Sequence, residues 1–150
     1  MNLLQEIGSD LTGLEQLKVM MTEDRRPGLG ETLGIRLIEV EEGRVVLEAT
    51  PDVRHYNPLG TVHGGFAATM LDFACGYAVL SKMTPGMSFA TLELKMAYHK
   101  PITKDTGPVR AEGTIVTMGG QAAFTEARLV DVDDRLYASA TSSLLVMDPT

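Results

Sequence analysis

The chain has a single cysteine, Cys75, and fewer basic than acidic residues. One cysteine excludes a disulfide within the chain and is typical of a reducing compartment. The 13 lysines and arginines stand against 20 acidic residues, which leaves a net charge of −7 and a pI near 4.9. This balance argues against a surface for nucleic acid or anionic membrane, and an anionic ligand would need a local basic patch.

Signals for export or membrane insertion are also missing. The start, "MNLLQEIGSDL", has acidic residues where a secretory signal would be basic, and its apolar run is too short. The apolar stretch 64–81 approaches membrane-spanning length, but it carries a central aspartate that no second span could shelter. We therefore expect no membrane contact and a cytoplasmic location.

The chain shows no internal repeat, linker or low-complexity segment, and its 150 residues suit one domain, 1–150. Apolar residues at helical spacing, interrupted by Gly8 and Gly13, predict a short, broken N-terminal helix. The Pro- and Gly-rich stretch 25–34 predicts a loop. Alternating patterns and turn residues predict six strands around the helix 64–81, and therefore an α+β architecture. The strands are expected within 35–41, 44–50, 88–101, 107–118, 121–132 and 135–147.

Asp72, in the middle of the apolar helix 64–81, is the first candidate functional residue. A helix that is apolar all round must be buried all round, and an isolated buried carboxylate is costly to desolvate. Asp72 could equally be a structural acid that bonds a local donor or faces a solvated edge.

The stretch "HGG" at 63–65 stands where a loop becomes this helix, and Asn57 lies in the loop before it. The N–H groups of a helix's first turn are unpaired and carry the positive end of its dipole. Glycine there lets a ligand approach the backbone closely. The pattern predicts a site for a developing oxyanion.

The spacing of Gly64 and Asp72 sets a further condition. Eight helical residues span about 12 Å, whereas one reacting carbonyl needs each group within about 3 Å. If both residues are catalytic, they must come from two chains. A two-fold dimer with antiparallel helices would bring Gly64 of one subunit near Asp72 of the other, and a monomer would be inactive.

The stretch "NPLGTVHGGFAATMLD" (57–72) resembles the hotdog-fold acyl-CoA thioesterases, in particular their PaaI-like (phenylacetate-pathway) branch. The segments "TLELKMAYHKPI", "AAFTEARLVD" and "LYASATSSLLVM" resemble later strands of that family, so the likeness covers about residues 30–147. It implies a curved antiparallel sheet wrapped around one long central helix, with a short N-terminal helix. It also implies hydrolysis of an acyl-CoA thioester to free acid and CoA without a cofactor, by a homodimer that assembles into a homotetramer.

The resemblance also implies roles for individual residues. Asp72 would be the nucleophile or the general base, and the Gly64 N–H would polarise the thioester carbonyl. Asn57 would hold water or the thioester, and His63 would order the loop and the site. The residues expected near substrate are Gly65, Thr91, Gly119, Gly120 and Gln121, the last three through backbone N–H groups. The family often has a basic residue in that hairpin to contact the CoA phosphates, whereas the stretch 118–122 here is uncharged. The alternative phosphate partners are therefore Lys95, Lys100, Lys104 and Arg54.

Other chemistries fit the sequence less well. Cys75 with His63 could be imagined as a nucleophile pair, but a cysteine in an apolar helix is usually inert. The spacing of the three histidines, His55, His63 and His99, matches no compact zinc pattern. The other functions left open are hydrolysis of an acyl-carrier-protein or other pantetheine thioester, and a non-catalytic acyl-CoA-binding module.

Overall fold

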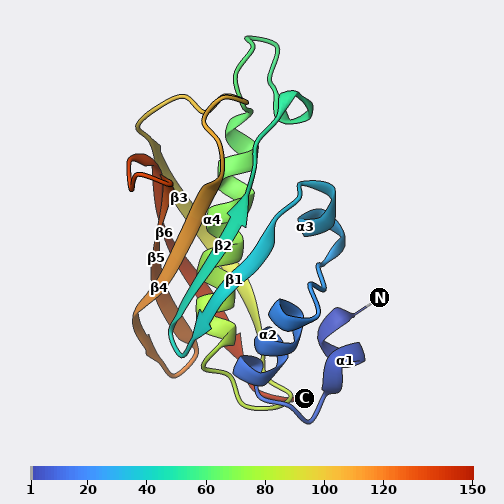
Figure 1. The fold of residues 1–150 in the computed structure, drawn as a ribbon. Helices are drawn as coiled ribbons and strands as arrows, with labels where there is room; N and C mark the ends of the chain where they lie inside the picture. Colours follow the sequence, from blue (N-terminus) through green and yellow to red (C-terminus); the bar gives the residue numbers. More distant parts are fainter. Residues whose placement is uncertain (1) are drawn as a thin grey trace.

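The computed structural model describes residues 2–150. One antiparallel sheet of six strands curves around the central helix α4 (Gly64–Leu80), as Figure 1 shows. The strand order is β1-β2-β4-β5-β6-β3, which leaves β1 and β3 at the edges. The strands are β1 (Arg36–Glu41), β2 (Arg44–Ala49), β3 (Ser88–Tyr98), β4 (Val109–Gly119), β5 (Ala122–Asp131) and β6 (Leu136–Met147). The predicted α+β architecture is confirmed.

Alternating burial explains how the sheet holds the helix. Along β5 the odd-numbered residues from Ala123 to Leu129 are buried, and the even-numbered ones from Ala122 to Arg128 are exposed. Side chains of a strand alternate between its two faces, so one face of the sheet packs against α4 and the other faces outward. The helix contacts five of the strands, β2 to β6.

The helix α4 is not buried all round in the single chain. Met70, Leu71 and Ala74 are fully buried against the sheet, whereas Thr69, Asp72 and Phe73 stay partly exposed. The expectation of complete burial is therefore wrong for one chain, because the sheet curves around only part of the helix. The remaining open face carries Asp72.

The N-terminal region forms three short helices, α1 (Leu3–Gly8), α2 (Gly13–Thr22) and α3 (Gly28–Thr32), on the side of α4 away from β4 and β5 (Figure 1). Thr12 and Glu15 form a capping box that starts α2, which confirms the predicted break. The loop predicted over 25–34 is wrong in part, because α3 forms directly after Pro27. The fixed backbone of proline suits the start of a helix.

Strand β3 is a long edge strand, and one row of its backbone groups has no neighbouring strand among residues 2–150. Its pairing with β6 shifts register between Thr91 and Glu93, which places a β-bulge at Leu92. Beyond the bulge Leu94 and Met96 are partly buried, whereas Leu92 at the bulge is 63% exposed.

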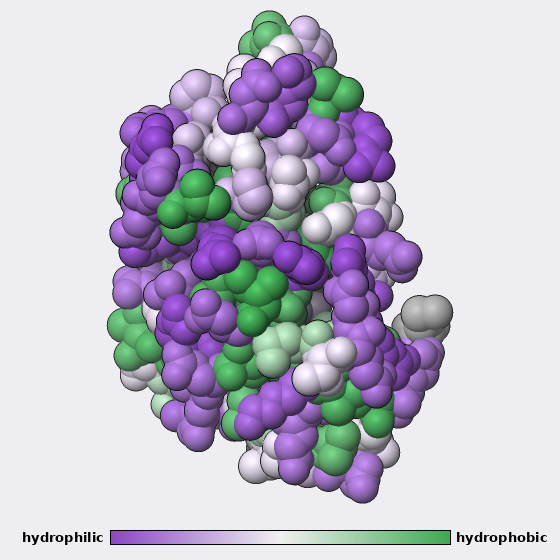
Figure 2. All heavy atoms as spheres, viewed as in Figure 1, coloured by the Kyte–Doolittle hydropathy of each residue, from purple (hydrophilic) through white to green (hydrophobic). Residues whose placement is uncertain are grey.

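The surface is polar over most of the face seen in Figure 2, with apolar side chains in smaller patches between the polar ones. Among residues 2–150, no helix combines the length and apolarity needed to cross a membrane. The cytoplasmic location expected from the sequence stays a prediction.

Candidate active site

The first turn of α4 is shaped by His63, its N-cap residue. The His63 Nδ1 accepts a hydrogen bond of 2.8 Å from the Gly65 N–H, so the neutral ring carries its proton on Nε2. A Cβ at Gly65 would lie 3.0 Å from that Nδ1, so glycine gives this cap the room it needs. The cap uses one N–H of the first turn and fixes the direction in which the helix starts.

The N–H of Gly64 has no hydrogen-bond partner among residues 2–150, so it is free to act as a donor. Its carbonyl accepts a hydrogen bond of 2.8 Å from the Tyr98 hydroxyl at the end of β3. A Cβ at Gly64 would lie 3.1 Å from this hydroxyl oxygen. Tyr98 is a contact that the sequence reasoning missed, and only its place at the end of an alternating strand could have suggested it.

A cavity of about 290 Å³ opens beside this turn, between α4 and the segment that follows β3. Burial raises the pKa of Tyr98 at its edge, so the phenol stays protonated and remains a donor. The residues that line the cavity include His63, Gly64, Ala67, Tyr98, Lys100 and Ile102. Lys100 brings a positive charge to the lining of this cavity.

Asp72 lies on the open face of α4 and is held by Thr91. The Thr91 hydroxyl donates a hydrogen bond of 3.0 Å to Asp72 Oδ1. Asp72 has no ion-pair partner among residues 2–150, and no hydrogen bond there reaches its Oδ2. One oxygen of the carboxylate is therefore oriented and the other is available, as a base or nucleophile requires.

The bulge at Leu92 allows β3 to contact α4 twice, through Thr91 at Asp72 and through Tyr98 at Gly64. Thr91 and Tyr98 are seven residues apart, so in a regular strand they would point to opposite faces. The extra residue reverses the alternation between them, and both side chains point to α4. β3 therefore contacts the helix both at its first turn and at its acid.

Within one chain the structure does not bring Asp72 and Gly64 together. Both lie in the uninterrupted helix α4, so the separation of about 12 Å along the axis stands. The Gly64 N–H and the Asp72 carboxylate cannot both contact one thioester carbonyl of the same subunit.

Asn57 is occupied by its own loop. Its Oδ1 accepts from the N–H groups of Leu59 and Thr61 at 2.9 and 3.3 Å, and its Nδ2 donates to the Thr61 hydroxyl at 3.1 Å. In this arrangement Asn57 shapes the segment that leads to His63. Its contact with water or substrate stays a prediction.

The hairpin with Gly119, Gly120 and Gln121 lies at the other end of the sheet from Gly64. Val146 donates to the Gln121 carbonyl, whereas Tyr98 pairs with Ala138. Eight residues of β6 separate these two levels, or about 26 Å. The hairpin and the Gly64 turn of one chain therefore lie too far apart to contact the same chemical group. A phosphate-binding role for the hairpin stays a prediction.

The three histidines lie in three different settings. His55 is buried and its ring packs on Phe66 with centroids 4.6 Å apart. His99 contacts the Ser139 hydroxyl at 2.9 Å, while His63 caps α4.

Cys75 is completely buried on α4, one turn from Asp72. Burial, and to a smaller degree the charge of Asp72, raises the pKa of the thiol to about 11. A thiol that stays protonated is a poor nucleophile.

Cys75→Ala is therefore expected to keep kcat for thioester hydrolysis within about twofold, because the thiol takes no part in the reaction. Melting temperature, measured alongside, separates a packing loss from a catalytic one. A loss of activity in a folded Cys75→Ala protein would instead assign the nucleophile to Cys75.

Comparison with known proteins places this geometry in a family. Residues 59–138, more than half of the chain, match the family model of the thioesterase superfamily. A Saccharolobus solfataricus protein named as an esterase is 30% identical over 115 residues, 77% of this chain and 80% of that protein. The chain belongs to the thioesterase superfamily. The prediction of a thioester hydrolase is thereby confirmed.

A further relative and a solved structure are also similar to this chain. The 1,4-dihydroxy-2-naphthoyl-CoA hydrolase of Listeria monocytogenes is 25% identical over 119 residues, 79% of this chain and 95% of that enzyme. The structure of the E. coli PaaI protein from the phenylacetic acid degradation operon superposes with a TM-score of 0.79 at 21% identity. That match covers 92% of this chain and 96% of PaaI, and it confirms the predicted hotdog fold.

Proposed function

We propose that this protein hydrolyses an acyl-CoA thioester to the free acid and CoA. The observation that carries the proposal is the Asp72 carboxylate, exposed in part, held by Thr91 and free of any cation partner within residues 2–150. As a general base, Asp72 takes a proton from water while the water oxygen attacks the thioester carbon. As a nucleophile, it forms a mixed anhydride that water then cleaves. In both routes the C–S bond breaks: in the first the sulfur takes the proton that Asp72 removed from water, and in the second CoA leaves as the thiolate and is protonated by solvent.

The proposed active site is shared between two subunits. The free Gly64 N–H of one subunit polarises the thioester carbonyl. Asp72 of the partner chain acts on the same carbonyl as the base or the nucleophile. The unpaired edge of β3 supports this arrangement, because a long exposed edge strand readily pairs with another chain. Leu92, exposed on that edge, would gain cover in such a pair. Antiparallel pairing of β3 with its copy would also set the two α4 helices antiparallel.

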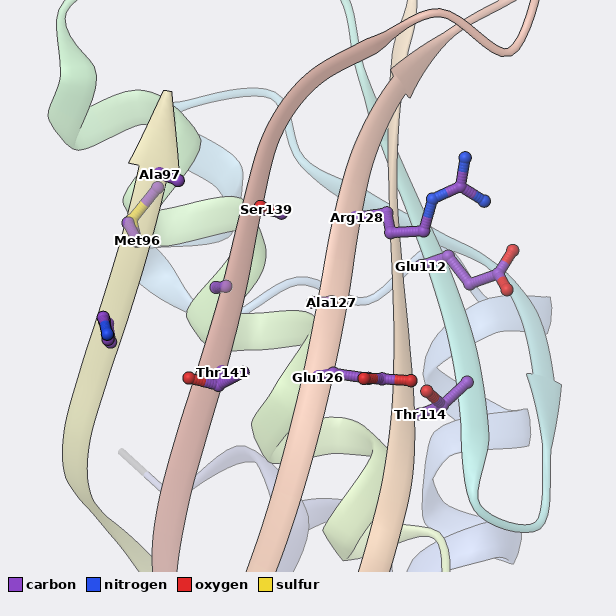
Figure 3. A pocket seen from close by; sticks show the side chains of 11 residues that line it. Met96, Ala97, Glu112, Thr114, Glu126, Ala127, Arg128, Ser139 and Thr141 are labelled. Atoms are coloured by element: carbon purple, nitrogen blue, oxygen red, sulfur yellow. The ribbon is translucent and has the colours of Figure 1, made fainter. Parts of the chain in front are cut away.

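A homotetramer is the proposed larger assembly, built on the outer face of the sheet. A hollow of about 600 Å³ lies there. Figure 3 shows Glu126 and Thr141, two of the residues that line it, on neighbouring strands. Lys95 and Glu126 flank Thr141, and neither makes an ion pair within residues 2–150. A two-fold axis along β6 would place Lys95 of each copy over Glu126 of the other. Sedimentation equilibrium distinguishes the dimer from the tetramer.

For the phosphates of CoA, Lys100 is the cation best placed beside Gly64. Arg54 and Lys104 have carboxylate partners at 2.6 and 2.9 Å, in Asp52 and Asp105. Lys95 faces the outer hollow instead. The N–H groups of Gly119, Gly120 and Gln121 remain the proposed phosphate donors from the hairpin. We propose that all of these residues belong to a single hotdog domain that spans 1–150.

The decisive experiment is a thiol-release assay across aromatic and aliphatic acyl-CoAs and an acyl-carrier-protein thioester. Wild-type protein should hydrolyse acyl-CoAs, and the buried Cys75 should add little thiol background. Hydrolysis of the carrier-protein thioester alone would favour the alternative pantetheine substrate. Binding of acyl-CoA without any turnover would show a non-catalytic module and sink the proposal.

A further inference from the structure

Two parallel rows of side chains run from Asp72 toward the C-terminal end of α4. On the helix, Asp72, Gly76 and Leu80 follow one another at four-residue spacing and share one side. On β3 and the segment before it, Thr91, Phe89 and Met87 follow at two-residue spacing and run in the opposite direction. One helical turn and two strand residues both advance about 6 Å, so the rows stay in step.

The two rows contact each other at two successive steps. Thr91 contacts Asp72 through the hydrogen bond of 3.0 Å. One step further, the Phe89 ring lies directly on Gly76, where a Cβ would be 2.9 Å from its Cε2 atom. A glycine at 76 is what lets an aromatic ring sit against the helix backbone one turn beyond the acid.

Beyond the ring, at the third step, a cavity of about 290 Å³ lies between the N-terminal helices and the segment after α4. Leu4, Leu80, Met83, Met87 and Phe89 form the apolar part of its lining, and polar residues such as Gln5 and Gln16 of the N-terminal helices form the rest. The volume is near the lower end for small-molecule pockets, so it suits an apolar tail rather than a whole acyl-CoA. Methionine side chains adapt readily to such a guest.

We propose that Phe89 sets the length of acyl chain that this protein accepts, by standing between Asp72 and this cavity. An acyl group extending from the carbonyl along α4 passes Asp72 and meets the Phe89 ring. Short acyl groups end before the ring. Longer unbranched chains reach the Leu80–Met83–Met87 cavity only when the ring is displaced or removed. This inference rests on the proposed acyl-CoA hydrolysis and adds the determinant of substrate length.

The test compares Phe89→Ala with wild type on straight-chain acyl-CoAs of increasing length. We expect the ratio of kcat/KM for long over short chains to rise roughly tenfold or more, because buried methylenes discriminate by about that factor each. Activity on the shortest substrates should change little. Phe124→Ala is the matched control, since it removes an exposed ring from the outer face of the sheet. Phe89→Leu serves the same purpose if the alanine variant does not fold.

Binding of S-alkyl-CoA thioethers, which cannot be hydrolysed, separates this inference from the proposed function. Calorimetric Kd values should show a wild-type length limit that Phe89→Ala extends and Phe124→Ala leaves in place. If the thioethers bind in this way but no acyl-CoA is hydrolysed, the proposed function fails and the length determinant stands. An unchanged length profile in both Phe89 variants, by hydrolysis and by binding, would overturn the inference.

Discussion

Asp72→Asn is expected to lower kcat for acyl-CoA hydrolysis by about 10²-fold or more, with little change in KM. The amide keeps the size of the side chain and can still accept the hydrogen bond from Thr91. It loses the ionised oxygen that takes the proton or attacks the carbonyl, and loss of a general base costs about this factor. Steady-state thiol release measures both constants, and circular dichroism confirms that the fold is kept.

Asn57→Ala is the matched control for this loss. Asn57 bonds within its own loop and takes no proton, so its removal should cost less than the loss of the acid. Equal activity in wild type and Asp72→Asn would eliminate Asp72 as base and as nucleophile. The proposed mechanism would then have no chemical group to rest on.

Mixing two inactive variants is expected to restore activity, because each active site takes its parts from two chains. One variant is Asp72→Asn, and the other is Gly64→Val, whose side chain crowds the approach of the carbonyl to the backbone N–H. After random exchange of subunits, a mixed dimer holds one site with both defects and one intact site. Half of the dimers in an equal mixture are mixed, so about a quarter of wild-type activity should return.

The Gly64 variant needs its own control, because a Cβ there would also lie 3.1 Å from the Tyr98 hydroxyl. Tyr98→Phe removes the hydrogen bond to the Gly64 carbonyl without filling the space beside the N–H. If Tyr98→Phe is as inactive as Gly64→Val, the loss reflects the helix start and not the blocked donor. Mixtures that stay inactive after proven subunit exchange would show that acid and donor come from the same chain.

The sequence alone determined the central helix and the order of helix and strands along the chain. Apolar residues around most of 64–80 predict a helix that other elements must cover, and the alternation in β5 defines which face of the sheet packs on it. The "HGG" stretch at the helix start, and Asp72 eight residues after Gly64, could be identified as candidate site residues for the same reason. These are local patterns, and local backbone geometry turns them into structure.

Only the tertiary structure decided how these pieces meet. The bulge at Leu92 reverses the face of β3, so Thr91 reaches Asp72 while Tyr98 reaches Gly64. A bulge depends on how two strands pair, and the sequence of one strand does not specify it. The ring of Phe89 on Gly76 likewise joins residues that no periodicity relates. Such contacts arise from the packing of a strand on a helix, which is settled only when the whole sheet closes around α4.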